Sequence, residues 1–214
     1  MDAGLEAELS PPLRLALAWA PRHARPATLA LFALDTRLAG FLRRGTEPLP
    51  VQMRLAWWRD TLGAPPSAWP QGDPLLDELR TWAAPEALVA LVDGWEGLLA
   101  ETLDPEAITG FALGREQAWS ALAREVGASR AEPAAAARAW ALADLAANLS
   151  APEERRRVIE AAGPLHFALP GERALRPLAV LGGLGRRALR RGGLPLLDGR
   201  TAALVALRLG MLGR

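Results

Sequence analysis

The stretch Met53-Arg54-Leu55-Ala56-Trp57-Trp58-Arg59-Asp60-Thr61-Leu62 places two adjacent tryptophans between two arginines. Four apolar residues in it and just before it recur at the spacing i, i+4, i+7 and i+11, which is one stripe of a helix: Val51, Leu55, Trp58 and Leu62. Arg54 and Arg59 lie off that stripe. The stretch therefore predicts an amphipathic helix with a large aromatic anchor.

Helix signals recur on both sides of this stretch, whereas strand signals are scarce. Prolines near first turns, and short breaks rich in glycine or proline, delimit the expected helices. These cover residues 13–20, 26–44, 50–62, 75–82, 85–99, 105–126, 134–149, 172–191 and 200–212, with another beginning near Pro152. Because the loops are short, we expect sequential helices to pack antiparallel in a single all-α domain spanning residues 1–214.

Two features of the later helices predict close packing. The expected helix 134–149 is rich in alanine, so its neighbours can approach closely. Gly182-Gly183-Leu184-Gly185 resembles a phosphate loop only superficially, because no strand precedes it and no lysine follows it. A flexible or closely packed helix is the better interpretation of that segment.

Composition excludes several kinds of chemistry. The chain has 214 residues, half of them hydrophobic, which suffices for a sizeable core. It contains no cysteine, so disulfides and thiolate sites are excluded, and no lysine, so a Schiff base is excluded. The two histidines have no metal-site spacing. With a net charge of +1 and no nucleic-acid-binding motif, we expect no nucleic-acid partner.

Two segments together resemble a known family. WAPRHARPATLALFALD (residues 19–35) is similar to the "YAP…R.A..ALYAF" helix of the squalene/phytoene synthase family, and EPLPVQMRLAWWRDTL (residues 47–62) is similar to its "E..LGxIRLQWWRDAL" helix. The similarity is strongest in residues 13–62 and extends through 93–127 and 134–149. It implies a head-to-head isoprenyl diphosphate synthase fold, an isoprenoid (terpenoid) synthase-like helical bundle around a central cavity. In that family two aspartate-rich motifs hold Mg²⁺, which bridges the diphosphate leaving group.

Both aspartate-rich motifs are degenerate in this chain. Ala39 and Gly40 stand where the first motif's paired aspartates would fall, and Asp35 is the only acid near them. In the second motif Asp144 takes the family's asparagine position and Asn148 takes its first aspartate position. Because a Mg²⁺ site needs several oxygen ligands, we expect no metal, no cofactor and no catalytic residue.

Three functions stay open at this point. The first is a protein that has lost diphosphate catalysis and acts as a binding or assembly factor, as in the complex I assembly factor branch that the chain resembles, with an apolar or isoprenoid ligand or a protein partner. The second is an active farnesyl or geranylgeranyl diphosphate transferase that uses Mg²⁺. The third is a carrier of an apolar ligand.

Eight residues are candidates for binding a substrate or ligand: Asp35, Arg22, Arg25, Trp58, Asp93, Glu96, Asp144 and Asn148. Arg22 and Arg25 could bind a phosphate at the cavity mouth or pair with Asp35. Asp93 and Glu96 lie one helical turn apart and could be polar groups of the cavity. A solvated pair at a helix edge is the favoured interpretation of those two acids.

The C-terminal part of the chain is basic. Residues 172–214 carry nine arginines against Glu172 and Asp198. Arg186, Arg187, Arg190 and Arg191 lie beside leucines, so they predict an amphipathic helix for an anionic membrane surface or, equally, a solvated face. The N-terminus is acidic, unlike a signal peptide, so we expect a cytoplasmic protein, with a peripheral place at the inner membrane as the alternative. Trp69 and Trp82 are expected at the surface, as a dimer contact.

Overall fold

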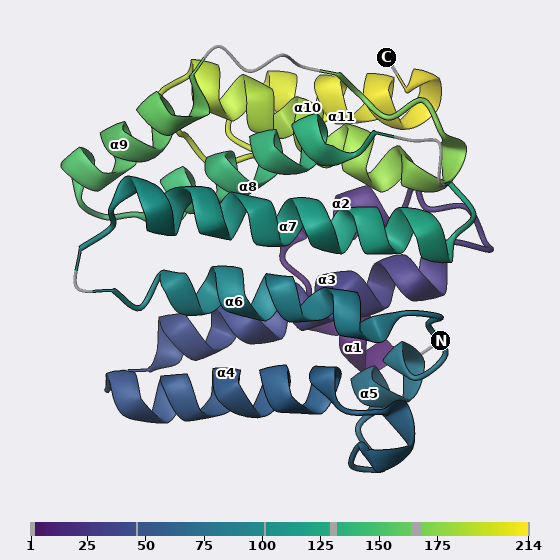
Figure 1. The fold of residues 1–214 in the computed structure, drawn as a ribbon. Helices are drawn as coiled ribbons and strands as arrows, with labels where there is room; N and C mark the ends of the chain where they lie inside the picture. The colour runs from purple at the N-terminus through teal and green to yellow at the C-terminus, as the bar shows by residue number, and fades with distance from the viewer. Residues whose placement is uncertain (1–2, 46, 101, 129–131, 164–167, 214) are drawn as a thin grey trace.

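The computed structural model describes residues 3–45, 47–100, 102–128, 132–163 and 168–213, and within them all regular structure is helical (Figure 1). The α-helices are α1 (Ala3–Ala7), α2 (Pro11–Leu17), α3 (Arg25–Arg44), α4 (Pro48–Gly63), α5 (Pro74–Leu79), α6 (Val89–Gly97), α7 (Pro105–Glu125), α8 (Ala134–Asn148), α9 (Pro152–Ala162), α10 (Arg176–Arg190) and α11 (Arg200–Leu212). Short 3₁₀ turns cover Pro66–Ala68, Pro85–Leu88 and Arg173–Leu175. The all-α prediction is confirmed. None of the described helices has both the length and the apolar character needed to cross a membrane.

Most predicted helix boundaries fall within a few residues of the observed ones, because capping and proline signals are local. Asp73 caps α5 by accepting hydrogen bonds from the backbone N–H groups of Leu75 and Leu76, and Asp104 caps α7 in the same way through Ala107. The predicted helix 85–99 is wrong in extent. Its first turn is a 3₁₀ turn and α6 ends at Gly97.

The tryptophan stretch forms α4, as its periodicity predicts. All four residues of the predicted stripe are buried: Val51, Leu55, Trp58 and Leu62. The adjacent Trp57 stays 44% exposed. The prediction that Trp69 and Trp82 lie at the surface is wrong. Each is only 4% exposed, and the Trp69 indole donates a hydrogen bond to the Ala64 carbonyl at 2.9 Å.

Helices α4, α6, α7, α8 and α10 follow one another through the molecule, with α3 packed behind them and α11 at the far end from α4 (Figure 1). Two of these helix–helix contacts are close enough to require glycine. A Cβ on Gly114 of α7 would strike the Ala90 carbonyl of α6, and one on Gly185 of α10 would lie 2.6 Å from the Ala139 carbonyl of α8. The predicted close packing of the alanine-rich helix and of the glycine segment is therefore confirmed.

An aromatic cluster joins α3, α7 and α8 in the core. The Trp119 ring lies 5.8 Å from that of Phe32 and 6.2 Å from that of Trp140, both edge-on. Such edge-to-face pairs are favoured by the ring quadrupoles. This cluster forms the rigid base on which the site described next is built.

Candidate functional site

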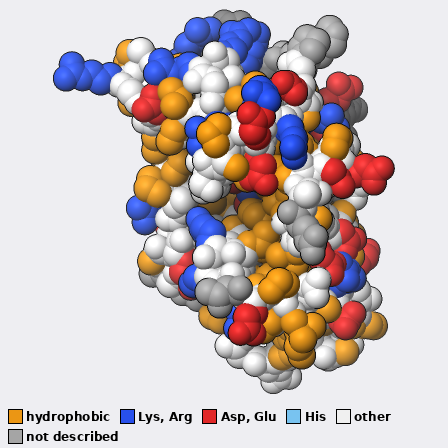
Figure 2. All heavy atoms as spheres, turned by 90° about the vertical axis from the view of Figure 1, so that its left-hand side faces the viewer, with side chains coloured by type: hydrophobic (Ala, Val, Ile, Leu, Met, Phe, Trp, Pro, Cys, Tyr) orange, Lys and Arg blue, Asp and Glu red, His pale blue; other side chains and the backbone are white. Residues whose placement is uncertain are grey.

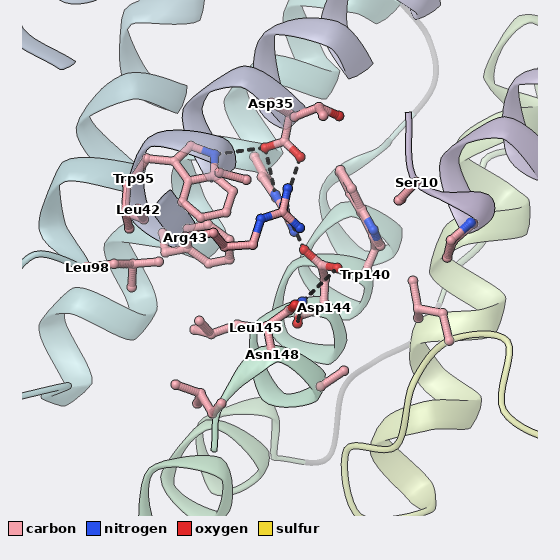
Figure 3. Close-up of a pocket in the computed structure, with 18 of the residues that line it drawn as sticks. Ser10, Asp35, Leu42, Arg43, Trp95, Leu98, Trp140, Asp144, Leu145 and Asn148 are labelled. Carbon is pink, nitrogen blue, oxygen red and sulfur yellow. Dashed lines mark hydrogen bonds and ion pairs between the residues drawn. The ribbon is translucent and has the colours of Figure 1, made fainter. Parts of the chain in front are cut away.

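A cavity of about 690 Å³ opens where α3, α6 and α8 end and α7 begins. Figure 2 faces this end of the molecule and shows a hollow lined mainly by hydrophobic side chains. Its apolar wall is formed by Leu13, Leu42, Leu98, Leu103, Leu145, Leu149 and Leu196. Most of its polar residues come from α3, α7 and α8, and Figure 3 shows several of them turned toward one another. The cavity is thus a mostly apolar space with a polar cluster at one side.

Arg115 is the centre of that polar cluster. It is only 2% exposed, and its Nε and Nη2 donate hydrogen bonds to the two carboxylate oxygens of Asp35 at 3.1 and 2.8 Å. Nη2 also donates to Asp144 Oδ2 at 2.8 Å. The Trp95 indole completes the shell of Asp35 by donating to Oδ1 at 2.9 Å. One guanidinium therefore bridges the acids of α3 and α8 (Figure 3).

Aromatic rings surround the same guanidinium. Its central carbon lies 4.1 Å from the ring centre of Trp140, 4.6 Å from that of Phe111 and 5.3 Å from that of Trp95. The ring faces attract the cation while their apolar bodies keep water away. The close approach of α6 to α7 brings Trp95 and Phe111 together, with ring centres 4.8 Å apart.

Burial shapes the electrostatics of this cluster. Burial raises the pKa of Asp35 above its ordinary value, and the neighbouring Arg115 charge opposes that rise without cancelling it. For Arg115, burial lowers the pKa, but Asp35 and Asp144 together outweigh it and hold the pKa above its ordinary value. The guanidinium is therefore permanently charged. Burial has instead made the Asp35 carboxylate bind a proton more readily.

Two buried polar atoms of the cavity wall have no hydrogen-bond partner within the described part of the chain. They are Arg115 Nη1, a donor, and Thr36 Oγ1, which can both donate and accept. Buried polar groups are normally satisfied, so these two atoms are unsatisfied hydrogen-bonding groups beside the cavity, and neighbouring atoms must shift for a ligand or a water to reach them.

The cavity lining carries more negative than positive charge. Among the described lining residues, Glu8, Asp35, Asp144 and Glu154 face two cations, Arg43 and Arg115, which gives these six a formal charge of −2 when every acid is ionised. Arg43 is exposed at the rim, while Arg115 is neutralised by its carboxylates. An anionic group would thus meet little uncompensated positive charge inside the cavity.

Three of the predicted ligand-binding residues meet in the cavity: Asp35, Asp144 and Asn148. Asn148 lies at the rim, and its Nδ2 donates to the Asp144 backbone carbonyl at 2.8 Å. The other five lie elsewhere. Trp58 is 2% exposed in the core beneath a separate depression beside α4, with the Arg37 guanidinium 5.6 Å from its ring centre.

Asp93 and Glu96 of α6 both pair with Arg59 of α4, and neither lines the cavity. Arg25 pairs with Glu6 and donates to the Leu17 carbonyl at 2.9 Å. Arg22 is exposed and does not line the cavity. The predicted pairing of these two arginines with Asp35 is wrong.

Arg115 itself was missed from the sequence, although a signal for it exists. It lies four residues after Phe111 and four before Trp119, inside the apolar stripe of its own helix. A charged residue in the middle of a buried stripe is rare unless it is paired, so its position indicates a buried ionic contact. The identity of its partners could not be read from the chain, because Asp35 is 80 residues away.

Among the described residues, no three or more His, Cys, Asp or Glu side chains gather as a group that could hold a metal ion. Asp35 and Asp144 do share the cavity, but both accept hydrogen bonds from Arg115. Comparison of the chain with protein-family models, with curated proteins and with solved structures found no match. The resemblance to the squalene/phytoene synthase family therefore stays a prediction.

Proposed function

We propose that the protein binds a single uncharged amphipathic molecule with an apolar chain in this cavity and does not transfer a diphosphate group. The observation that carries the proposal is the bridge from Arg115 to both Asp35 and Asp144. These are the acids remaining near the two motifs in which the family resemblance would place Mg²⁺ ligands. An internal guanidinium pairs with both acids, whereas in a catalytic site they would be available to a metal ion.

The charge of the cavity lining also disfavours binding of a diphosphate. A diphosphate carries about three negative charges and is normally held by Mg²⁺ or by several cations. The cavity lining has an excess of acids, so a diphosphate would be repelled. A hydroxyl or carbonyl group instead matches Thr36 Oγ1 and Arg115 Nη1, while an apolar chain matches the leucine wall. The family resemblance makes an isoprenoid alcohol the first probe to try.

The test is equilibrium dialysis of the full chain with labelled farnesol and with farnesyl diphosphate, each with and without Mg²⁺. We expect one farnesol per chain and binding of the diphosphate at least about tenfold weaker, a difference of about 1.4 kcal/mol. Leu145→Trp should narrow the apolar part of the cavity and weaken farnesol binding. The matched control Leu207→Trp adds the same ring at the exposed α11 surface and should leave binding unchanged.

A second variant tests the polar contact. Thr36→Val keeps the side-chain shape but removes the hydroxyl, so it should weaken binding of farnesol and leave binding of the hydrocarbon farnesene unchanged. Equal effects on both probes would mean that Thr36 Oγ1 does not contact the ligand.

The competing function is a Mg²⁺-dependent prenyl transferase, and the meeting of Asp35 and Asp144 in one cavity supports it. Its signature would be Mg²⁺-dependent release of diphosphate from farnesyl or geranylgeranyl diphosphate that is lost in Asp144→Ala. That result would overturn our proposal. A role as a carrier or as an assembly factor is compatible with ligand binding, and each stays a proposal.

A further inference from the structure

We infer that the outer face of α11 is a docking surface for an anionic membrane. Four large apolar side chains of this helix are exposed: Leu204 (65%), Leu207 (49%), Met211 (63%) and Leu212 (62%). The opposite side of α11 is buried against α10 and α2, where Ala202, Ala206 and Leu209 are at most 6% exposed. The helix is thus anchored on one side and presents an unpartnered apolar side to the surroundings.

Arginines lie on the same arc of the helix as these apolar residues. At about 100° per residue, Leu204, Leu207, Met211 and Leu212 span about 140° of the circumference, and Arg200 and Arg208 fall within that arc. Both arginines are exposed. Exposed apolar side chains beside arginines combine the two contributions, apolar burial and electrostatic attraction, that bind a helix to an anionic bilayer surface.

The end of α10 adds further charge beside α11. Arg187 Nη2 donates a hydrogen bond to Thr201 Oγ1 near the start of α11, and Arg190 and Arg191 are exposed just after it along α10. Residues 177–213 contain six arginines and one aspartate, a net charge of +5. Figure 2 shows arginine side chains gathered at the top, the end of the molecule at which α9, α10 and α11 lie in Figure 1.

Helix α10, whose sequence predicts a membrane-facing helix, cannot supply apolar contact with a membrane. Its leucines and alanine at this end are buried against the rest of the protein: Leu181, Leu184, Ala188 and Leu189. The arginines of α10 therefore supply charge only, and α11 supplies the apolar side chains. This division of roles is visible only once the two helices are packed together.

Charge favours a lipid surface over another apolar occupant. Helix α4, at the other end of the molecule in Figure 1, also exposes apolar side chains, with Leu49 66%, Met53 65% and Trp57 44% exposed. Residues 47–63, however, carry two arginines and two acids, a net charge of zero. Of these two faces, the α11 face is the one that combines exposed apolar side chains with the positive charge that anionic lipids attract.

The experiment is sedimentation of the full chain with vesicles of phosphatidylcholine alone or with 30% phosphatidylglycerol. We expect binding to the anionic vesicles that weakens at high salt. Leu204→Asp/Met211→Asp should reduce the partition coefficient at least about tenfold, because each change removes apolar contact and adds negative charge. The matched control Leu49→Asp/Met53→Asp makes the same changes at equally exposed sites on α4 and should bind like the natural chain. Circular dichroism confirms that the variants are folded.

Arg200→Glu/Arg208→Glu keeps the apolar side chains and should remove the preference for anionic vesicles. Absence of binding by the natural chain at low salt, or equal losses in the α11 and α4 variants, would overturn the inference. A dimer in solution that dissociates on Leu204→Asp/Met211→Asp, without vesicle binding, would identify a second copy as the occupant and would also overturn it. Farnesol binding should be unaffected by these variants, so the two proposals can fail separately.

Discussion

Replacing Arg115 by methionine should lower the free energy of unfolding by about 3–5 kcal/mol at pH 7. Methionine fills much of the same space among the three aromatic rings, so the loss is chiefly electrostatic. Asp35, only 3% exposed, would lose two of its three hydrogen bonds and keep the one from Trp95. At about 1.5–3 kcal/mol for each bond to a charged group, the sum is about 3–6 kcal/mol. Because the pKa of Asp35 is already raised, proton uptake should offset part of this cost.

The assay is urea unfolding followed by far-UV circular dichroism and extrapolated linearly to water. A double-mutant cycle separates the energy of the Arg115–Asp35 interaction from that of side-chain packing. Asp35→Asn should lower the free energy of unfolding far less in the Arg115→Met background than in the natural chain. The control is Arg59→Met, since Arg59 pairs with Asp93 and Glu96 at partly exposed positions and should lose at most about 1 kcal/mol. A loss of under about 1 kcal/mol for Arg115→Met would refute the buried ionic bridge.

Three further predictions concern stability. The contribution of Asp35 to stability should fall as the pH rises. Below about pH 4 its carboxyl is protonated in both the folded and the unfolded state. Above that pH the carboxyl ionises more readily in the unfolded chain, because its pKa is raised in the folded protein, so ionisation favours unfolding. The free energy of unfolding of the natural chain, relative to Asp35→Asn, should therefore fall with rising pH; a rise would contradict the direction of the shift. Gly114→Ala should destabilise by about 1–3 kcal/mol, because its Cβ would meet the backbone of α6, whereas Gly110→Ala has open space and should stabilise by about 0.5–1 kcal/mol. Equal thermal shifts for the two variants would argue against the close helix contact. Asp73→Ala should cost about 1–2 kcal/mol by chemical denaturation, since it removes the cap of α5; an unchanged midpoint would show that the cap contributes nothing.

The sequence alone determined where most helices lie. Asp73-Pro74 and Asp104-Pro105 mark helix starts, and each aspartate caps its helix through a hydrogen bond that joins residues only two or three apart. The stripe of α4 likewise follows from local spacing, which fixes the buried face of a helix before its partner is known. The acids Asp35 and Asp144 could also be picked out, from the family resemblance.

Only the tertiary structure decided what those acids do. Arg115 reaches Asp35 across 80 residues and Asp144 across 29, and no local pattern encodes which distant side chains will share a buried space. The same holds at the surface, where Trp69 and Trp82 are buried by neighbours while Leu204, Leu207 and Leu212 of α11 stay exposed. Periodicity shows that a helix has an apolar face. Whether another element, a ligand or a lipid surface covers that face depends on how the helices assemble in space.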